Sequence, residues 1–182
     1  IEDIDVAVDE RGRVKVDDGM KTNLDWMWAP GDSNGRMMLA HAAFNMAEVA
    51  AENAMGGQQT YTGKYIPSCI YTTPELASVG LKEEDAKKIH DVSIGKFFFA
   101  GNGRALASGA GDGFIKVVSD SKTGEILGVH IVGPCAAEMI NEACALMTME
   151  ITAYEVPTIV HAHPSFSEAL MEAVADSIGE SL

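Results

Sequence analysis

The segment His161-Ala162-His163-Pro164-Ser165-Phe166-Ser167-Glu168 is the part of this sequence that most constrains the fold. Proline disfavours the helical region for the residue before it, so His163 is expected at the end of an extended segment. Ser165 and Glu168 have the S-x-x-E spacing of a capping box, which predicts that a helix begins beside them. An apolar face follows at helical spacing, formed by Ala169, Leu170, Ala173, Val174 and Ile178. The segment therefore places two imidazoles and a carboxylate at the start of a helix.

Two roles are open for Glu168. In a capping box its carboxylate accepts backbone N–H groups at the helix N-terminus. Alternatively, it orients the imidazole of His163 and raises its basicity, which is the base-and-orienter arrangement of acid–base catalysis. His161 is expected to be a packing or hydrogen-bonding histidine. Zinc binding by His161 and His163 is a remote alternative because no third ligand is apparent, so no metal site is expected.

This segment and the helix after it resemble the C-terminal signature of the pyridine nucleotide-disulfide oxidoreductases. Within that family, the double histidine is more similar to the dihydrolipoamide dehydrogenases than to glutathione reductases, whose motif resembles HPT-x-x-EE. The resemblance implies that His163 is the general base and Glu168 its partner. In that family the two residues serve the dithiol–disulfide centre of the other subunit of a homodimer.

The first section of the chain has the pattern of a nucleotide-binding fold. Alternating valines on both sides of residues 9–12 predict a hairpin-like pair of short strands. Residues 22–32 are predicted to form an apolar strand that ends in Gly31-Asp32, and residues 37–55 to form a helix. A strand, a Gly-Asp turn and a helix start can together hold a hydroxylated, electron-rich ligand. Turn chemistry alone also explains Asp32.

A second resemblance narrows the role of Asp32. The pattern T-x-x-x-x-x-W-A-P-G-D, which ends at Asp32, and the Met38-Leu39-Ala40-His41-Ala42 segment after it are similar to the second flavin motif of the same family. The resemblance implies that Asp32 binds the ribityl chain of FAD. It also implies that the backbone beside Met38, at Leu39, Ala40 and His41, lies near the flavin pyrimidine edge. Pro30 departs from the family pattern and removes one backbone donor.

The domain organisation follows from these segments. We expect the C-terminal part of an FAD-binding domain at 1–57, a polar linker at 58–64 and a dimerisation domain at 65–182. Residues 66–80 resemble the opening of the family's dimerisation domain. The predicted strands are 66–71, 76–81, 92–100, 114–119 and 125–132, and the predicted helices are 82–90, 136–149 and 152–156. The glycine-rich stretches at 101–104 and 109–113 are predicted to be turns. The expected fold class is α+β, an antiparallel sheet flanked by helices.

Composition limits the partners and the compartment. A net charge of −14 over 182 residues disfavours nucleic acid and anionic membrane surfaces. No run of about 18 apolar residues and no secretory signal is present, so a cytoplasmic location is expected. Cys69, Cys135 and Cys144 are an odd number at wide spacings, which predicts reduced and mostly buried thiols.

The chain opens at Ile1, and we expect it to be a fragment of a longer enzyme. It contains no G-x-G-x-x-G loop and no C-x-x-x-x-C pair. The resemblance implies a parent enzyme that oxidises a lipoyl-bearing substrate and passes electrons through a redox disulfide and FAD to NAD. The fragment alone is expected to form a homodimer and to be inactive. The alternatives are another disulfide reductase of the family, similar to glutathione reductase, and a non-catalytic dimerisation module.

Overall fold

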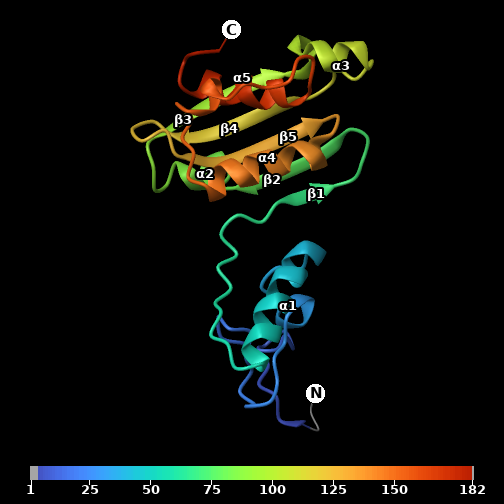
Figure 1. Cartoon of the computed structure of the whole chain (residues 1–182), viewed down its shortest axis with the longest axis vertical. Coiled ribbons are helices and arrows are strands. Elements are labelled where there is room, and N and C mark those ends of the chain that lie inside the picture. Colours follow the sequence, from blue (N-terminus) through green and yellow to red (C-terminus); the bar gives the residue numbers. More distant parts are fainter. Residues whose placement is uncertain (1–3, 182) are drawn as a thin grey trace. The chain divides into compact units, whose positions relative to one another are not determined.

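The structure is a computed structural model that describes residues 4–181. The chain divides into two compact units, one ending at Gly63 and the other beginning at Lys64. Figure 1 shows the helices and strands of both units along the chain. No helix within residues 4–181 is long and apolar enough to cross a membrane.

The first unit contains a short 3₁₀ helix, η2 (Gly31–Asn34), and one long helix, α1 (Ala40–Ala54). The predicted strand at 22–32 is wrong. The Thr22 hydroxyl accepts from the Leu24 backbone N–H at 3.1 Å, and Met27 N–H donates to the Leu24 carbonyl at 3.1 Å. These bonds close a tight turn where the strand was expected. A threonine hydroxyl can accept from a nearby backbone N–H group, which then makes no hydrogen bond to a neighbouring strand.

Two other predictions for this unit are only partly met. The valine hairpin is reduced to a single bridge between Val8 and Val14. The helix predicted from residue 37 begins at Ala40, because Leu39 is still extended (φ −136°, ψ 135°).

The turn that carries Asp32 packs directly on α1. Gly31 has φ +73°, a conformation that glycine adopts without strain, and its N–H lies 3.4 Å from the Met46 sulfur. A Cβ on Gly31 would lie 3.1 Å from the Cβ of Ala43, so the close approach requires a small residue. Asn34 is buried and donates its side-chain amide to the Ala29 carbonyl at 2.8 Å. The Gly-Asp turn is therefore fixed against the first half of this helix.

The second unit is built on a five-stranded sheet in the order β1-β2-β5-β4-β3, in which all neighbouring strands are antiparallel. Its strands are β1 (Ser68–Ile70), β2 (Glu75–Gly80), β3 (Val92–Phe98), β4 (Phe114–Asp120) and β5 (Ile126–Gly133). The predicted α+β class with an antiparallel sheet is confirmed. The first predicted strand, 66–71, is shorter than expected.

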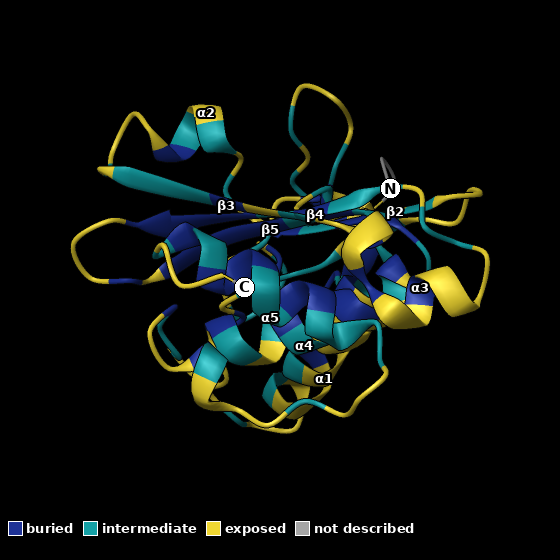
Figure 2. Cartoon of the chain, turned by 90° about the horizontal axis from the view of Figure 1, so that it is seen from above, coloured by how far each residue is buried: buried dark blue, intermediate teal, exposed yellow. Residues whose placement is uncertain are grey.

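The two faces of the sheet differ because side chains alternate along each strand. One cross-strand row is apolar and consists of Ala77, Ile131, Ile115 and Phe97. The adjacent row points to the other face and is polar: Ser78, His130, Lys116 and Lys96. Helices α4 (Ala136–Thr148) and α5 (Ser167–Ser177) cover the apolar face. Figure 2 shows the short helix α2 (Glu83–Ala86) on the opposite side of the sheet.

The short helices depart most from the predictions. Helix α2 fills only part of the predicted 82–90 helix. Residues 99–107, part of which was predicted to be a glycine turn, form η3 (Phe99–Gly101) and α3 (Gly103–Ala107). Asn102 starts α3 by accepting from Ala105 N–H at 2.9 Å, which is the role of an N-cap residue. The helix predicted at 152–156 is displaced to η4 (Val156–Thr158).

Asp120 organises the turn between β4 and β5. One carboxylate oxygen accepts from the backbone N–H groups of Thr123 (3.0 Å) and Lys122 (2.9 Å), and the other lies 2.9 Å from His90 Nδ1. The Thr123 N–H, then the Lys122 N–H and then His90 hold the pKa of Asp120 well below its ordinary value. Because the folded pKa is depressed, this stabilisation is present above about pH 4 and is lost as the pH falls further.

This network predicts a pH-dependent effect of Asp120→Asn. The variant keeps one oxygen acceptor for the two backbone donors but lacks the ionisable carboxylate. Its urea midpoint is expected to lie below that of the wild type at pH 7. The two midpoints should draw closer as the pH falls from about 4 to about 3, because the unfolded wild-type chain then binds a proton at this carboxyl group that the folded chain does not bind. A midpoint difference that stays constant between these pH values would contradict this account of the turn.

Candidate functional site

The carboxylate of Glu168 binds two partners at the start of α5. Its Oε1 lies 2.8 Å from His163 Nδ1, and its Oε2 accepts from the Ser165 backbone N–H at 2.7 Å. The Ser165 N–H and then the His163 bond lower the pKa of Glu168, so the carboxylate is held ionised. The two roles that the sequence left open for Glu168 are therefore performed together, one by each oxygen.

Only half of the predicted capping box forms. The Ser165 hydroxyl is buried and has no hydrogen-bond partner within residues 4–181. The helix begins at Ser167, after Phe166, which is already in the right-handed helical region (φ −73°, ψ −31°). Phe166 packs edge-on against the fully buried Phe99, with ring centroids 6.5 Å apart. Asn102 also donates to the Ser165 carbonyl at 2.9 Å. These contacts attach the start of α5 to the core without a serine cap.

The two histidines of the motif have different surroundings. His161 Nε2 lies 2.8 Å from a Glu142 carboxylate oxygen, and its Nδ1 lies 2.9 Å from the Ile159 carbonyl. Its side chain is 6% exposed, whereas that of His163 is 79% exposed. The expectation that His161 is a hydrogen-bonding residue agrees with this geometry.

Of the two histidines of the motif, His163 is the one with a ring nitrogen available for proton transfer. A carboxylate accepts, so His163 Nδ1 is the nitrogen that donates to Glu168. This assignment leaves its Nε2 with an unshared electron pair, and no described residue bonds to that atom. Both nitrogens of His161 face acceptors. The arrangement can therefore place an oriented, exposed base at His163.

The first unit carries the residues predicted to hold a flavin. Asp32 is exposed on η2, which packs on α1. Leu39 caps α1 without a side-chain hydrogen bond, and the first N–H groups of any helix lack intrahelical acceptors. Met38 and Ala40 are exposed beside them, as is His41. A carboxylate for hydroxyl groups and a helix N-terminus for developing negative charge fit a flavin of the expected kind.

Comparison with known protein families identifies the family of the chain. Residues 66–174 match the dimerisation domain of the pyridine nucleotide-disulphide oxidoreductases. The chain belongs to this family. Residues 1–47 match a second domain that is also described as pyridine nucleotide-disulphide oxidoreductase. The family predicted from the histidine and flavin motifs is therefore confirmed.

Individual oxidoreductases of this family are similar over nearly the whole chain. The chain is 44% identical to the dihydrolipoyl dehydrogenase of Thermus scotoductus over 174 residues, which are 95% of the chain and 38% of that protein. It is 41% identical to a dihydrolipoyl dehydrogenase of Bacillus subtilis over 167 residues, 91% of the chain and 36% of that protein. The HOCl-induced flavoprotein disulfide reductase RclA of Escherichia coli superposes with a TM-score of 0.90 at 28% identity, over 96% of this chain and 41% of RclA. The chain thus spans less than half the length of these relatives.

Two residues that contact the motif were missed by sequence reasoning. Glu142 lies on α4, 19 residues before its partner His161, and no local pattern connects them. Asn102 lies 63 residues before Ser165. Its position directly before Gly103 and a short helix was a usable N-cap signal.

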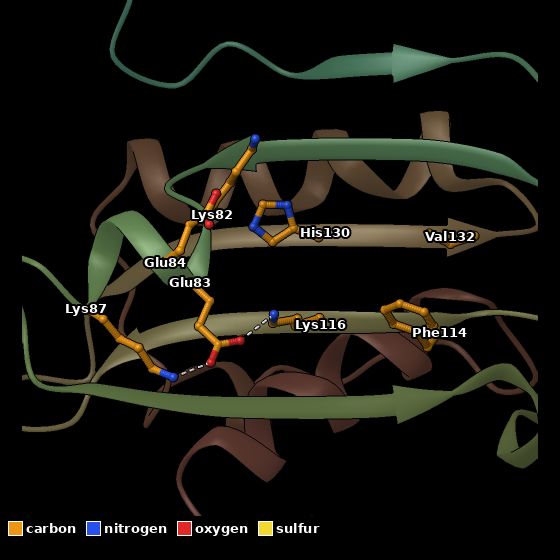
Figure 3. Close-up of a pocket in the computed structure, with 8 residues that line it drawn as sticks. All are labelled: Lys82, Glu83, Glu84, Lys87, Phe114, Lys116, His130 and Val132. Carbon is orange, nitrogen blue, oxygen red and sulfur yellow. Dashed lines mark hydrogen bonds and ion pairs between the residues drawn. The ribbon is translucent and has the colours of Figure 1, made fainter.

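A separate hollow lies on the polar face of the sheet. Figure 3 shows the Glu83 carboxylate between the amines of Lys116 and Lys87, to both of which it is paired. Lys116 and then Lys87 lower the pKa of Glu83 to about 2. His130 Nε2 lies 3.1 Å from the Leu81 carbonyl. Within this hollow Glu83 pairs with Lys87 and Lys116, and none of the lining residues belongs to the histidine motif.

The three cysteines are free thiols. Cys69 and Cys144 are partly buried, and burial raises the pKa of Cys144 to about 11. Cys135 is exposed, which corrects the expectation of mostly buried thiols. Its backbone has φ +54° directly before α4, where it turns the chain into the helix, so the side chain does not enter the core. Within the described range, no group of three or more His, Cys, Asp or Glu could hold a metal ion.

Proposed function

We propose that this chain supplies the dimerisation domain and the catalytic base of an FAD-dependent dihydrolipoyl dehydrogenase. The observation that carries the proposal is the 2.8 Å contact of His163 Nδ1 with Glu168, which leaves Nε2 on an exposed ring. The enzyme oxidises a dihydrolipoyl dithiol to the disulfide and passes two electrons to NAD. The identities of 36–44% to dihydrolipoyl dehydrogenases support a dihydrolipoyl substrate over the substrates of other disulfide reductases.

In the proposed reaction, His163 Nε2 takes the proton from a thiol of the substrate. The resulting thiolate attacks the redox disulfide of the enzyme, which is reduced as the lipoyl dithiol is oxidised. Glu168 keeps the imidazole in one orientation and stabilises the positive charge that the ring gains. The carboxylate suits this role because the Ser165 N–H holds it in place and ionised.

FAD, when bound, supplies the acceptor through which electrons pass from the reduced disulfide to NAD. In this chain Asp32 would bind its ribityl hydroxyls. The start of α1, from Met38 and Leu39 to Ala40 and His41, would face the electron-rich edge of the ring.

The proposed partners are a second copy of the chain and a lipoyl group, which the parent enzyme meets on a carrier protein. Several large apolar side chains of the second unit are strongly exposed, among them Val160 (96%), Tyr71 (80%) and Met149 (73%). Exposed apolar surface of this kind favours association with a second copy. The free thiols support a reducing, cytoplasmic compartment.

A chimera tests the proposed substrate. The chain would replace the segment that it matches in the Bacillus subtilis dihydrolipoyl dehydrogenase, which supplies the remaining parts of an enzyme. We expect NAD-dependent oxidation of dihydrolipoamide by the chimera and no reduction of glutathione disulfide above background. The unfused chain is the matched control and is expected to be inactive, because it has no C-x-x-x-x-C pair. A chimera that binds FAD but prefers glutathione would contradict the dihydrolipoyl assignment.

A further inference from the structure

His161 connects the histidine motif to helix α4. Glu142 lies in the middle of α4, and its carboxylate is 2.8 Å from His161 Nε2. The other ring nitrogen is 2.9 Å from the Ile159 carbonyl. Both ring nitrogens therefore face acceptor oxygens. The His161 side chain is only 6% exposed, so its contact with Glu142 is almost completely shielded from solvent.

The segment that carries His163 is held at both ends. Residues 159–164 form no helix or strand, so their position depends on contacts with neighbouring elements. On the C-terminal side, the backbone of Ser165 is bound by Glu168 and by Asn102. On the N-terminal side, the Glu142–His161 pair binds the segment to α4.

We propose that Glu142 and His161 are positioning residues that keep the His163 imidazole beside Glu168. This inference rests on the proposed role of His163 as the base. Neither positioning residue exchanges a proton with the substrate, because both ring nitrogens of His161 are occupied. Loss of Glu142 leaves a buried donor of His161 without an acceptor, which is costly in an apolar environment. The segment is then expected to move, and His163 to lose its contact with Glu168.

The test uses the 182-residue chain and nitrogen-15 NMR of the histidine rings at about pH 8, above the ordinary histidine pKa of about 6.5. In the wild type, His163 is expected in the form protonated at Nδ1. Glu142→Ala is expected to cause loss of that form, and His161→Phe to cause the same loss. Glu142→Gln retains an oxygen acceptor and is expected to keep the wild-type His163 spectrum. The double variant Glu142→Ala/His161→Phe should lose no more than either single variant, because the two residues act as one unit.

Glu138→Ala is the matched control, since it removes the same charge from an exposed position one turn earlier on α4. It is expected to leave the His163 ring signals unchanged. Backbone amide spectra of β4 and β5 show whether each variant is folded. If Glu142→Ala does not fold, His161→Phe and Glu142→Gln decide the result.

The positioning role is overturned if the folded Glu142→Ala or His161→Phe variant keeps the wild-type His163 signals, or if Glu142→Gln behaves like Glu142→Ala. A wild-type His163 that is not protonated at Nδ1 would instead contradict the proposed base itself. The two failures are therefore distinguishable.

Discussion

Replacing His163 with glutamine in the chimera is expected to lower dihydrolipoamide turnover by roughly 10²–10⁴-fold, the usual contribution of a positioned general base. Glutamine keeps a polar side chain of similar size, but it cannot take a thiol proton. The reaction then depends on the small fraction of substrate that is already a thiolate. The loss should appear mainly in kcat, because His163 is proposed to act on the thiol during the reaction and not to hold the lipoyl chain.

His130→Gln is the matched control for this substitution. His130 lies on the polar face of the sheet, and its Nε2 contacts the Leu81 carbonyl, to which a glutamine amide can also donate. The turnover of the His130→Gln chimera is expected to stay within about twofold of that of the parent chimera. The substitution lies away from the site and is expected to change stability little. Equal turnover in His163→Gln and His130→Gln would remove His163 from the mechanism.

Gly95→Ala is expected to have a large effect on folding. Gly95 lies in β3 beneath α5, and an added Cβ would be 2.0 Å from the Ala173 carbonyl oxygen and 2.5 Å from the Ser177 nitrogen. Both obstacles are backbone atoms, so the whole helix has to move away from the sheet. Overpacking of this kind costs about 1–3 kcal/mol and occasionally more. Urea unfolding of the 182-residue chain measures the loss.

The control for this prediction is Gly103→Ala. A Cβ at Gly103 meets nothing within 4 Å, and the residue is the first of α3. Alanine is there expected to be neutral or stabilising by up to about 1 kcal/mol, since it restricts the unfolded chain. If Gly95→Ala unfolds at the same urea concentration as Gly103→Ala, α5 is not packed against β3 as the structure has it.

The parts of the fold that sequence reasoning predicted are those determined by local periodicity. The hairpin predicted at 114–119 and 125–132 corresponds to β4 and β5, and the helix predicted at 136–149 corresponds to α4. The order of the five strands could not be predicted, because it depends on contacts between distant segments. Residues 22–32 were mistaken for a strand because their apolar composition outweighed the turn formed by the Thr22 hydroxyl.

The same difference between local patterns and contacts of distant segments applies to the candidate site. His163 and Glu168 lie five positions apart at a helix start, so spacing offered their contact as one of two roles for Glu168, and the family resemblance implied it. The contact of Phe166 with Phe99 could not be predicted, because these residues are far apart in the sequence. Glu142 reaches His161 only because α4 covers the sheet beside the motif, and such a contact has no signature in a single sequence.

The central claim is that Glu168 holds the Nδ1 proton of His163 and leaves Nε2 free to act as a base. The most direct measurement is the nitrogen-15 NMR spectrum of the His163 ring in the wild-type chain and in Glu168→Gln, at about pH 8, where an ordinary histidine is neutral. The account predicts a ring protonated at Nδ1 in the wild type and a mixture of both tautomers in the variant. A wild-type ring protonated at Nε2, or identical spectra for the two proteins, would contradict it.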